Sequence, residues 1–170
     1  GPEGVEGLKY AHPDVLGRMD QRRAAMWRPQ LTKLDAQWEG GNARYQVVED
    51  GLRDTPGLRL VDRPNEGRYV GSSLQFLLLD WPDVAISDVL GRCLARGVEL
   101  KWFGGAEPTG FTSRYDSWRY APSARMPASD RILHGVIDMR LPLTFSLEDC
   151  ALIARIIRSE VGAVWQEQAA

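Results

Sequence analysis

Residues 74–104 carry the most regular hydrophobic pattern in the chain. Apolar side chains alternate with their neighbours at Leu74, Phe76 and Leu78, which predicts a strand with one buried face. A helix is predicted next, from an apolar stripe at Ile86, Val89, Leu90, Cys93 and Leu94. Gly97 then stands where a residue of positive φ commonly ends a helix. Alternation resumes at Val98, Leu100 and Trp102, so the stretch predicts a strand–helix–strand unit.

Helical spacing also dominates residues 13–54. The large apolar side chains recur about once per turn, at Val15, Met19, Met26, Leu31, Leu34, Trp38, Tyr45, Val48 and Leu52. Pro29 lacks the N–H for its intrahelical bond, so it should kink this helix or start a new one. A bend is also expected at Gly40-Gly41, because each glycine costs about 1 kcal/mol in a helix relative to alanine. We therefore expect two or three helical pieces in series.

Shorter elements are predicted on either side of the central unit. Residues 58–61 predict a short strand between two turns. After a loop of some 25 residues, Ser129 is expected to cap a helix that runs through Ile132, Leu133, Val136 and Ile137. Residues 140–143 predict a short extended segment that Pro142 would confine to a sheet edge.

The last helix has a recognisable start. Ser146 and Asp149 have the spacing of a capping box, in which a hydroxyl and a carboxylate satisfy free N–H groups. This helix should run to about Trp165, with one apolar face made of Cys150, Ile153, Ile157, Val161 and Val164. The final helix would therefore supply a large part of the core.

Together these elements predict an α+β fold. Residues 55–170 should form a two-layer small domain, in which helices cover a three- to four-stranded sheet. The long interrupted helical arm of residues 13–54 precedes it. Residues 1–12 form an irregular arm whose opening Gly1-Pro2 resembles the remnant of a removed tag, so the native chain is expected to begin elsewhere.

Composition narrows the classes of partner. The chain has 170 residues, of which 44% are hydrophobic, enough for a core. Lys plus Arg number 21 and Asp plus Glu 23, so the net charge of −2 favours neither nucleic acid nor an anionic membrane as a partner. No apolar run approaches the roughly 20 residues of a membrane-spanning helix. Cys93 and Cys150 are predicted to be buried free thiols, which suits a cytoplasmic location.

Familiar catalytic and metal motifs are not evident in the sequence. The two histidines, His12 and His134, and the two cysteines lack the close pairing of zinc ligands, so no metal site is predicted. His134 is expected to be a hydrogen-bonded structural histidine. Neither a nucleophile elbow nor a glycine-rich phosphate loop is present.

The segment from Lys101 to Arg125 is the richest in candidate chemistry. It combines Lys101, Arg114, Arg119 and Arg125 with Trp102, Phe103, Phe111, Tyr115, Trp118 and Tyr120. Interleaved arginines and aromatic rings suit single-stranded nucleic acid, but they also suit a subunit interface or the wall of a small-ligand site. The acidic charge balance favours the interface or the ligand wall.

A series of short motifs runs through residues 14–165. They are Arg18-Met19-Asp20, Ala24-Ala25, Gln30-Leu31, Leu34-Asp35, Pro56-Gly57-Leu58, Arg96-Gly97-Val98-Glu99, the segment 136–143 and Ser146–Asp149. In order and spacing they resemble the signature of the DegT–StrS family of sugar aminotransferases, which depend on pyridoxal 5′-phosphate. The resemblance implies the linking helix and small domain of a fold-type-I homodimer.

The resemblance also implies that the chemistry lies elsewhere. In that family a large N-terminal domain holds the cofactor and the Schiff-base lysine, and Lys9, Lys33 and Lys101 do not match that position. The chain is therefore expected to be a C-terminal portion, or a free-standing relative of it, with no catalytic residue. It should bind no cofactor and be inactive alone, and its partners should be the large domain, a second copy and a small-molecule substrate.

The resemblance also implies site residues, which are assigned by their positions in the matching motifs. Arg18 matches a family arginine and is expected to face the cofactor, although Leu16 and Gly17 stand where the family has a phosphate-contacting asparagine. The substrate-side wall is expected at Lys101, Trp102, Phe103, Arg114 and Trp118, with Trp102-Phe103-Gly104 replacing the family's His-Tyr-Pro. The alternative is a non-catalytic interaction or dimerisation module that uses the aromatic loop 102–120.

Overall fold

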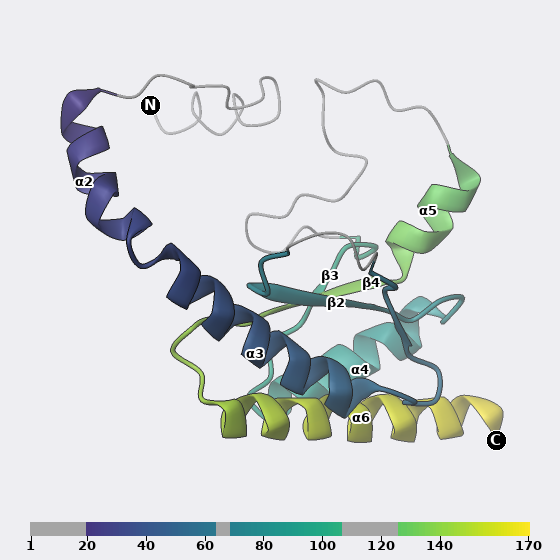
Figure 1. Ribbon diagram of the computed structural model, residues 1–170. Helices are drawn as coiled ribbons and strands as arrows, with labels where there is room; N and C mark the ends of the chain where they lie inside the picture. Colours follow the sequence, from purple (N-terminus) through teal and green to yellow (C-terminus); the bar gives the residue numbers. More distant parts are fainter. Residues whose placement is uncertain (1–19, 64–68, 107–125) are drawn as a thin grey trace, which may run out of the picture.

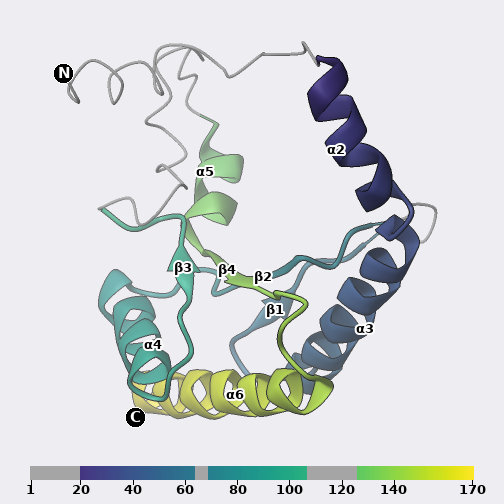
Figure 2. The ribbon, with the colours of Figure 1, turned by 90° about the vertical axis from the view of Figure 1, so that its left-hand side faces the viewer.

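The computed structural model describes residues 20–63, 69–106 and 126–170. Along the chain the elements are α2 (Gln21–Leu31), α3 (Leu34–Leu52), β1 (Arg59–Leu60), β2 (Ser73–Leu77), α4 (Asp83–Ala95), β3 (Lys101–Trp102), α5 (Pro127–His134), β4 (Val136–Arg140) and α6 (Leu147–Ala169). Helices α3, α4 and α6 gather on one side of the sheet, whereas α2 and α5 extend away from it (Figures 1 and 2). The predicted α+β architecture is confirmed.

The four strands have the order β1-β2-β4-β3, and every neighbouring pair is antiparallel. Strands β2 and β3 are therefore parallel to each other, with β4 inserted between them. The strand–helix–strand unit exists as predicted, but its two strands are not neighbours. This split arrangement is a recurrent way to fill the gap beneath a crossover helix.

The segment before β4 departs from the prediction. Helix α5 ends at His134, and Val136 and Ile137, expected in that helix, belong to β4 instead. Gly135 allows this change, because a Cβ there would lie 2.8 Å from the carbonyl oxygen of Leu78, just past the end of β2. The helix begins at Pro127, so Ser129 lies inside it and does not cap it.

The extended segment predicted at residues 140–143 was also misplaced. Strand β4 ends at Arg140 and is paired on both sides, so it is central and not an edge strand. Pro142 lies beyond its end, where its missing N–H removes no ladder bond. The alternation of Ile137 and Met139 toward the core was concealed because the predicted segment starts four residues too late, with Val136 and Ile137 assigned to the preceding helix.

One continuous core lies between the sheet and the helices. The predicted inward positions of β2, Leu74, Phe76 and Leu78, are all fully buried. The stripe predicted on α4 is confirmed except at Leu94, which is 61% exposed. Both cysteines are free and buried, as predicted. Among the described residues, no helix combines the length and apolar character needed to cross a membrane.

Helix α3 crosses α6 at close range. A Cβ on Gly51 would lie only 2.6 Å from the Cβ of Ala154, so the crossing needs glycine at this point. From α6, the Arg158 guanidinium donates to the carbonyl oxygen of Arg53, 2.7 Å away, just past the end of α3. This contact fixes the C-terminal half of α3 to the body of the domain.

The helical arm is interrupted only once within the described residues. Pro29 lies inside α2, and the break comes shortly after it, at residues 32–33. The bend expected at Gly40-Gly41 is absent, since both residues lie within the uninterrupted helix α3. The chain before β2 passes beside α3 here, and the approach requires glycine at residue 71, where a Cβ would lie 2.7 Å from the carbonyl oxygen of Gly41; a Cβ on Gly41 would make only an ordinary contact at 3.5 Å.

The predicted capping box at the start of α6 is confirmed. The N–H of Asp149 donates to the Ser146 hydroxyl at 3.0 Å, and the Asp149 carboxylate accepts from the N–H of Ser146 at 2.8 Å. The pKa of Asp149 is lowered, first by the backbone N–H of Ser146 and then by the Ser146 hydroxyl, because both stabilise the ionised carboxylate. Helix α6 continues past Trp165 to Ala169, one turn beyond the prediction.

Candidate functional site

The predicted substrate-side wall begins on β3, whose pleat separates its residues. In the sheet register Lys101 stands opposite Asp138 and Trp102 opposite the buried Ile137. Since successive strand residues point to opposite faces, Lys101 lies on the face away from the helices, and Phe103 lies in the turn after the strand. Trp102 packs against the core instead. The wall therefore divides between two faces, and its role in binding substrate stays a prediction.

Trp102 is held by the end of α5. Its indole N–H donates to the carbonyl oxygen of His134 at 2.6 Å, and the two rings meet edge to face with centroids 5.6 Å apart. The Nε2 atom of His134 lies 3.1 Å from Oδ1 of Asp83, at the start of α4. This histidine is thus hydrogen-bonded and structural, as the sequence predicted.

A second charged contact fixes α5 to the loop after β2. Arg131 forms a two-pronged hydrogen bond with the Asp80 carboxylate, which lowers the pKa of Asp80. Helix α5 has no fully buried residue. It is therefore positioned mainly by these polar contacts and by the indole of Trp102.

A row of polar side chains crosses the sheet on the face away from the helices. Gln75, Asp138 and Lys101 occupy directly paired positions on β2, β4 and β3. The Gln75 amide donates to Asp138 Oδ1 at 2.5 Å and to the Ser73 hydroxyl at 2.8 Å. Gln75 and Asp138 were not predicted as site residues, because no strand was predicted at residue 138 and the pairing of the two was therefore not foreseen.

A small cavity of about 310 Å³ opens where the chain before β3 diverges from β4. Its walls include the charged residues Glu99, Lys101, Asp138 and Arg140, and its apolar lining includes Phe145. Lys101 is the one predicted wall residue that lines it. A mixed set of charges over an apolar floor suits a small polar ligand, but no described contact selects one.

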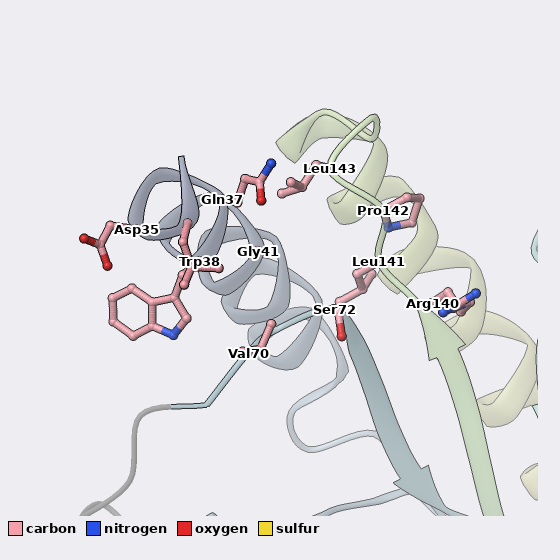
Figure 3. A pocket seen from close by; sticks show the side chains of 11 residues that line it. Asp35, Gln37, Trp38, Gly41, Val70, Ser72, Arg140, Leu141, Pro142 and Leu143 are labelled. Carbon is pink, nitrogen blue, oxygen red and sulfur yellow. The ribbon is translucent and has the colours of Figure 1, made fainter. Parts of the chain in front are cut away.

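A larger cavity, of about 670 Å³, lies between α3 and the chain that follows β4. Figure 3 shows its sides, with Gln37 and Gly41 on α3 facing Leu141 and Leu143 across the opening. The lining is mostly apolar, with Asp35, Gln37, Ser72 and Arg140 as the polar members. None of the predicted wall residues belongs to it, and the sequence predicted no site here, although the motif Leu34-Asp35 and the segment 136–143 both contribute to the lining.

Hydrogen bonds to α3 hold the floor of this large cavity. The indole N–H of Trp38 donates to the carbonyl oxygen of Tyr69 at 2.6 Å, and the N–H of Gly71 donates to Asn42 Oδ1 at 2.9 Å. The guanidinium of Arg63 lies over the ring of Tyr69, 4.0 Å from its centroid. The chain entering β2 is therefore tied to α3 along its length.

Arg44 holds the opposite side of the large cavity. Its guanidinium donates to three carbonyl oxygens, those of Gly40, Leu143 and Phe145, at distances of 2.6 to 3.0 Å. Two of these acceptors lie in the loop between β4 and α6. The cavity is thus built on a fixed frame, because both of its walls are bonded to the same helix.

The remaining predicted residues lie outside the described part of the chain. Arg18, expected to face the cofactor, belongs to residues 1–19, and the wall residues Arg114 and Trp118 belong to residues 107–125. Most of the aromatic loop 102–120 falls there too. Their roles stay predictions.

The described lysines do not provide a cofactor site by themselves. A lysine that forms a Schiff base is usually desolvated in an apolar pocket. Lys33 is exposed at the turn between α2 and α3, and Lys101 lies on the rim of the small charged cavity. Neither setting fits. Within the described residues, no cluster of His, Cys, Asp or Glu has the arrangement of a metal site.

Comparison with known proteins gives a fold likeness. No protein-family model matches the sequence, and no curated protein matches it. Among solved structures, Helicobacter pylori PseC, an aminotransferase of pseudoaminic acid biosynthesis, matches 86% of this chain with a TM-score of 0.68 and 14% identity. DesI, crystallised with its TDP-sugar product, matches 89% with a TM-score of 0.65 and 16% identity.

A DegT DnrJ EryC1 StrS aminotransferase from Brucella abortus matches 85% of this chain, with a TM-score of 0.61 and 17% identity. At such identities the likeness concerns the fold alone. The chain covers 38% of PseC, 38% of DesI and 36% of the Brucella enzyme. It therefore has the fold of one part of these aminotransferases and spans less than half of their length.

Proposed function

We propose that this chain is the linking helix and C-terminal small domain of a pyridoxal-phosphate-dependent aminotransferase of the DegT–StrS type. The observation that carries the proposal is the agreement of two kinds of evidence. The fold likeness covers 85–89% of this chain in three such aminotransferases, and the sequence motifs from Arg18 to Asp149 follow the family's order. Sugar-like substrates are the proposed class, by analogy with DesI and its TDP-sugar product.

In this proposal the chain supplies no catalytic residue. The cofactor and the Schiff-base lysine belong to a large domain, because neither Lys33 nor Lys101 has a suitable setting. The cofactor supplies the electron sink for amino-group transfer when it is bound. This chain would contribute Arg18 toward the cofactor and would form one wall of the substrate cleft with Lys101 and Phe103. The complete protein would be a homodimer located in the cytoplasm.

The test compares two proteins, the 170-residue chain and the product of its gene with any upstream coding sequence included. Each is incubated with pyridoxal phosphate, reduced with borohydride and mapped by peptide mass spectrometry. The longer product should carry one labelled lysine outside these 170 residues, and the 170-residue chain should carry none. Stoichiometric label on Lys33 or Lys101 would contradict the assignment of the Schiff-base lysine to a large domain. An unlabelled longer product would contradict the aminotransferase proposal itself.

A matched pair of variants sharpens the assignment of Arg18. In the longer product, Arg18→Gln should weaken cofactor binding by roughly tenfold or more, since it removes one charge-assisted contact to an anion. Arg22→Gln removes an arginine four residues away and should leave binding unchanged. Equal effects of the two variants would show that Arg18 has no specific role.

A further inference from the structure

We propose that the small cavity beside β3 is a binding site for a free α-amino acid with an apolar side chain. The ligand would lie in the gap where β3 stops pairing with β4, with its side chain on the apolar floor of the cavity. The site belongs to the 170-residue chain, so it does not rest on the aminotransferase assignment. Three observations carry it: an interrupted strand ladder, a balanced set of charges and an apolar floor of limited size.

The first observation is the interruption of the ladder between β3 and β4. The N–H of Phe103 donates to a carbonyl oxygen of β4 at 3.1 Å, and hydrogen-bonded pairs recur at every second residue of an antiparallel ladder. Lys101 and Asp138 therefore form the next such pair. Glu99 and Arg140 would follow, but among the described residues no backbone hydrogen bond joins them. Their main-chain N–H and C=O groups thus face the cavity and are available to a ligand.

The second observation is the charge around the opening. Lys101 and Arg140 bring two positive charges to the cavity lining, and Glu99 and Asp138 bring two negative ones. A simple anion would meet two carboxylates, and a simple cation would meet two cationic groups, so a ligand that carries both charges is favoured over either. In the described part of the chain, Glu99 and Arg140 are exposed and form no salt bridge.

The third observation is the apolar floor. It consists of side chains from four segments of the chain, Val98, Met139, Phe145 and Ile153. Phe145 and Ile153 are only partly buried, so a ligand can remove more of their apolar surface from water. Ligand pockets span roughly 300 to 1,000 Å³, and the volume of about 310 Å³ therefore admits one small molecule.

An α-amino acid meets these three requirements in one molecule. Its carboxylate can accept from a main-chain N–H of the gap and pair with Arg140, and its ammonium can donate to a main-chain carbonyl oxygen and pair with Glu99. Its side chain then covers Phe145 and Ile153. Leucine and methionine have apolar side chains of suitable length, whereas glycine has none. A peptide fits less well, because its ammonium and carboxylate are separated by at least one residue.

Isothermal titration calorimetry of the 170-residue chain with leucine and methionine tests the site. At least one of them should bind with a Kd of about 1 mM or lower. N-acetylleucine lacks the ammonium and leucinamide lacks the carboxylate, so each should bind at least about tenfold more weakly than leucine. Glycine should give no measurable heat. The proposal would be overturned if neither amino acid bound, if the blocked compounds bound as well as leucine, or if a leucine-containing dipeptide bound more tightly.

Nuclear magnetic resonance of the ¹⁵N-labelled chain locates the bound amino acid. The backbone amide signals of Glu99 and Arg140 should shift on addition of leucine, because these two N–H groups face the gap. The amide signal of Gly51, at the crossing of α3 and α6, should not move. Shifts confined to residues outside the small cavity would place the ligand elsewhere and exclude this site.

Two variants with matched controls test the charges and the floor separately. Glu99→Gln should weaken leucine binding by roughly tenfold, and Ile153→Phe should weaken it at least as much by filling the floor. The controls are Glu39→Gln and Leu152→Phe, which alter an exposed acid of α3 and an exposed apolar residue of α6 outside the cavity lining. Unchanged thermal melts would show that each variant is folded, and undiminished binding by both cavity variants would overturn the proposal.

The same titration of the longer product separates this site from the proposed aminotransferase function. Lys101 is the only residue that the cavity shares with the proposed substrate wall, and no variant alters it. A lysine label in the longer product without leucine binding would therefore leave the aminotransferase proposal intact and overturn this one. Equal Kd values for the 170-residue chain and the longer product are expected, and loss of binding in the longer product alone would exclude the site from the complete protein.

Discussion

The two halves of the helical arm have the same apolar spacing and opposite environments. In the second half of α3, Leu52 is fully buried, whereas Leu31 in α2, three heptads earlier on the same stripe, is 59% exposed. The residue type is identical, and the spacing of apolar residues in the sequence is the same in both halves. The comparison shows that the side-chain pattern selects which face of a helix is apolar, but the rest of the fold decides whether that face is covered.

Helix α6 and the sheet cover the apolar face of the second half of α3. Helix α6 contacts the second half of α3, where Gly51 lies against Ala154 and Arg158 bonds the carbonyl oxygens of Gly51 and Arg53. Helix α2 extends beyond this layer (Figure 2). Trp38 marks the transition, since its indole bond to the carbonyl oxygen of Tyr69 joins α3 to the chain before β2, and Arg44 follows with its bonds to the loop after β4.

The largest expected change in stability comes from a substitution in the buried second half of α3. Leu52→Ala should lower the free energy of unfolding by about 2–5 kcal/mol, because it removes a fully buried side chain and leaves a cavity. Leu31→Ala removes the same atoms from an exposed site, so it should change the free energy of unfolding by less than about 0.5 kcal/mol. Urea denaturation at a concentration where the chain is monomeric measures both. Similar losses at the two sites would show that α2 is covered.

The next effect concerns the close crossing. Gly51→Ala should destabilise by about 1–3 kcal/mol, because its Cβ would overlap Ala154. Gly91→Ala in α4 is the control, since no atom lies within 4 Å of a Cβ there, and it should stabilise by about 0.5–1 kcal/mol. Thermal melts should therefore shift in opposite directions. A shift of the same sign would mean that the α3–α6 crossing is looser than the structure shows.

A smaller effect is expected at the start of α6, the helix that covers the buried half. Ser146→Ala should cost about 1 kcal/mol through loss of the cap. Asp149 has a lowered pKa in the folded state, so its contribution is present above the unfolded pKa and is lost as pH falls through the folded value. Asp149→Asn should thus be less stable than the wild type at neutral pH and converge with it in acid. A difference independent of pH would exclude the carboxylate as its cause.

The smallest effect at neutral pH is expected where the stripe enters the core. Burial raises the pKa of Tyr45 from 10.0 to about 12. The fold therefore favours the neutral phenol, and the stability that this gives is present below pH 10 and is lost as pH rises toward 12. Tyr45→Phe should lose less stability than the wild type across that interval. Ultraviolet titration of the tyrosinate checks the assignment, and parallel alkaline unfolding curves would contradict it.

Much of the local structure was predictable from sequence because its causes are local. The stripe of α4, the alternation in β2, the positive φ of Gly97 and the capping box of Ser146 depend on residues within a few positions of one another. For the same reason the α+β class followed from the order of the elements. The resemblance to one aminotransferase family rested on motif order, and the fold likeness agrees with it.

The candidate site was less predictable, because it depends on pairing between distant segments. Lys101 and Trp102 are neighbours in sequence, but the register against β4 places them on opposite faces of the sheet. Asp138 joined Gln75 and Lys101 only because β4 entered between β2 and β3. The large cavity likewise joins the start of α3 to residues about 100 positions later, and no short-range pattern marks such a meeting.

By itself the sequence determined the phase of each helix and strand, since the spacing of apolar residues fixes which side of an element can be buried. The tertiary structure alone decided the position of β4, the division of the β3 residues and the exposure of Trp27 and Leu31. The physical reason is that burial is a property of two surfaces. A stripe such as that from Trp27 to Leu52 defines one of them, and only the folded chain, or a second chain, provides the other.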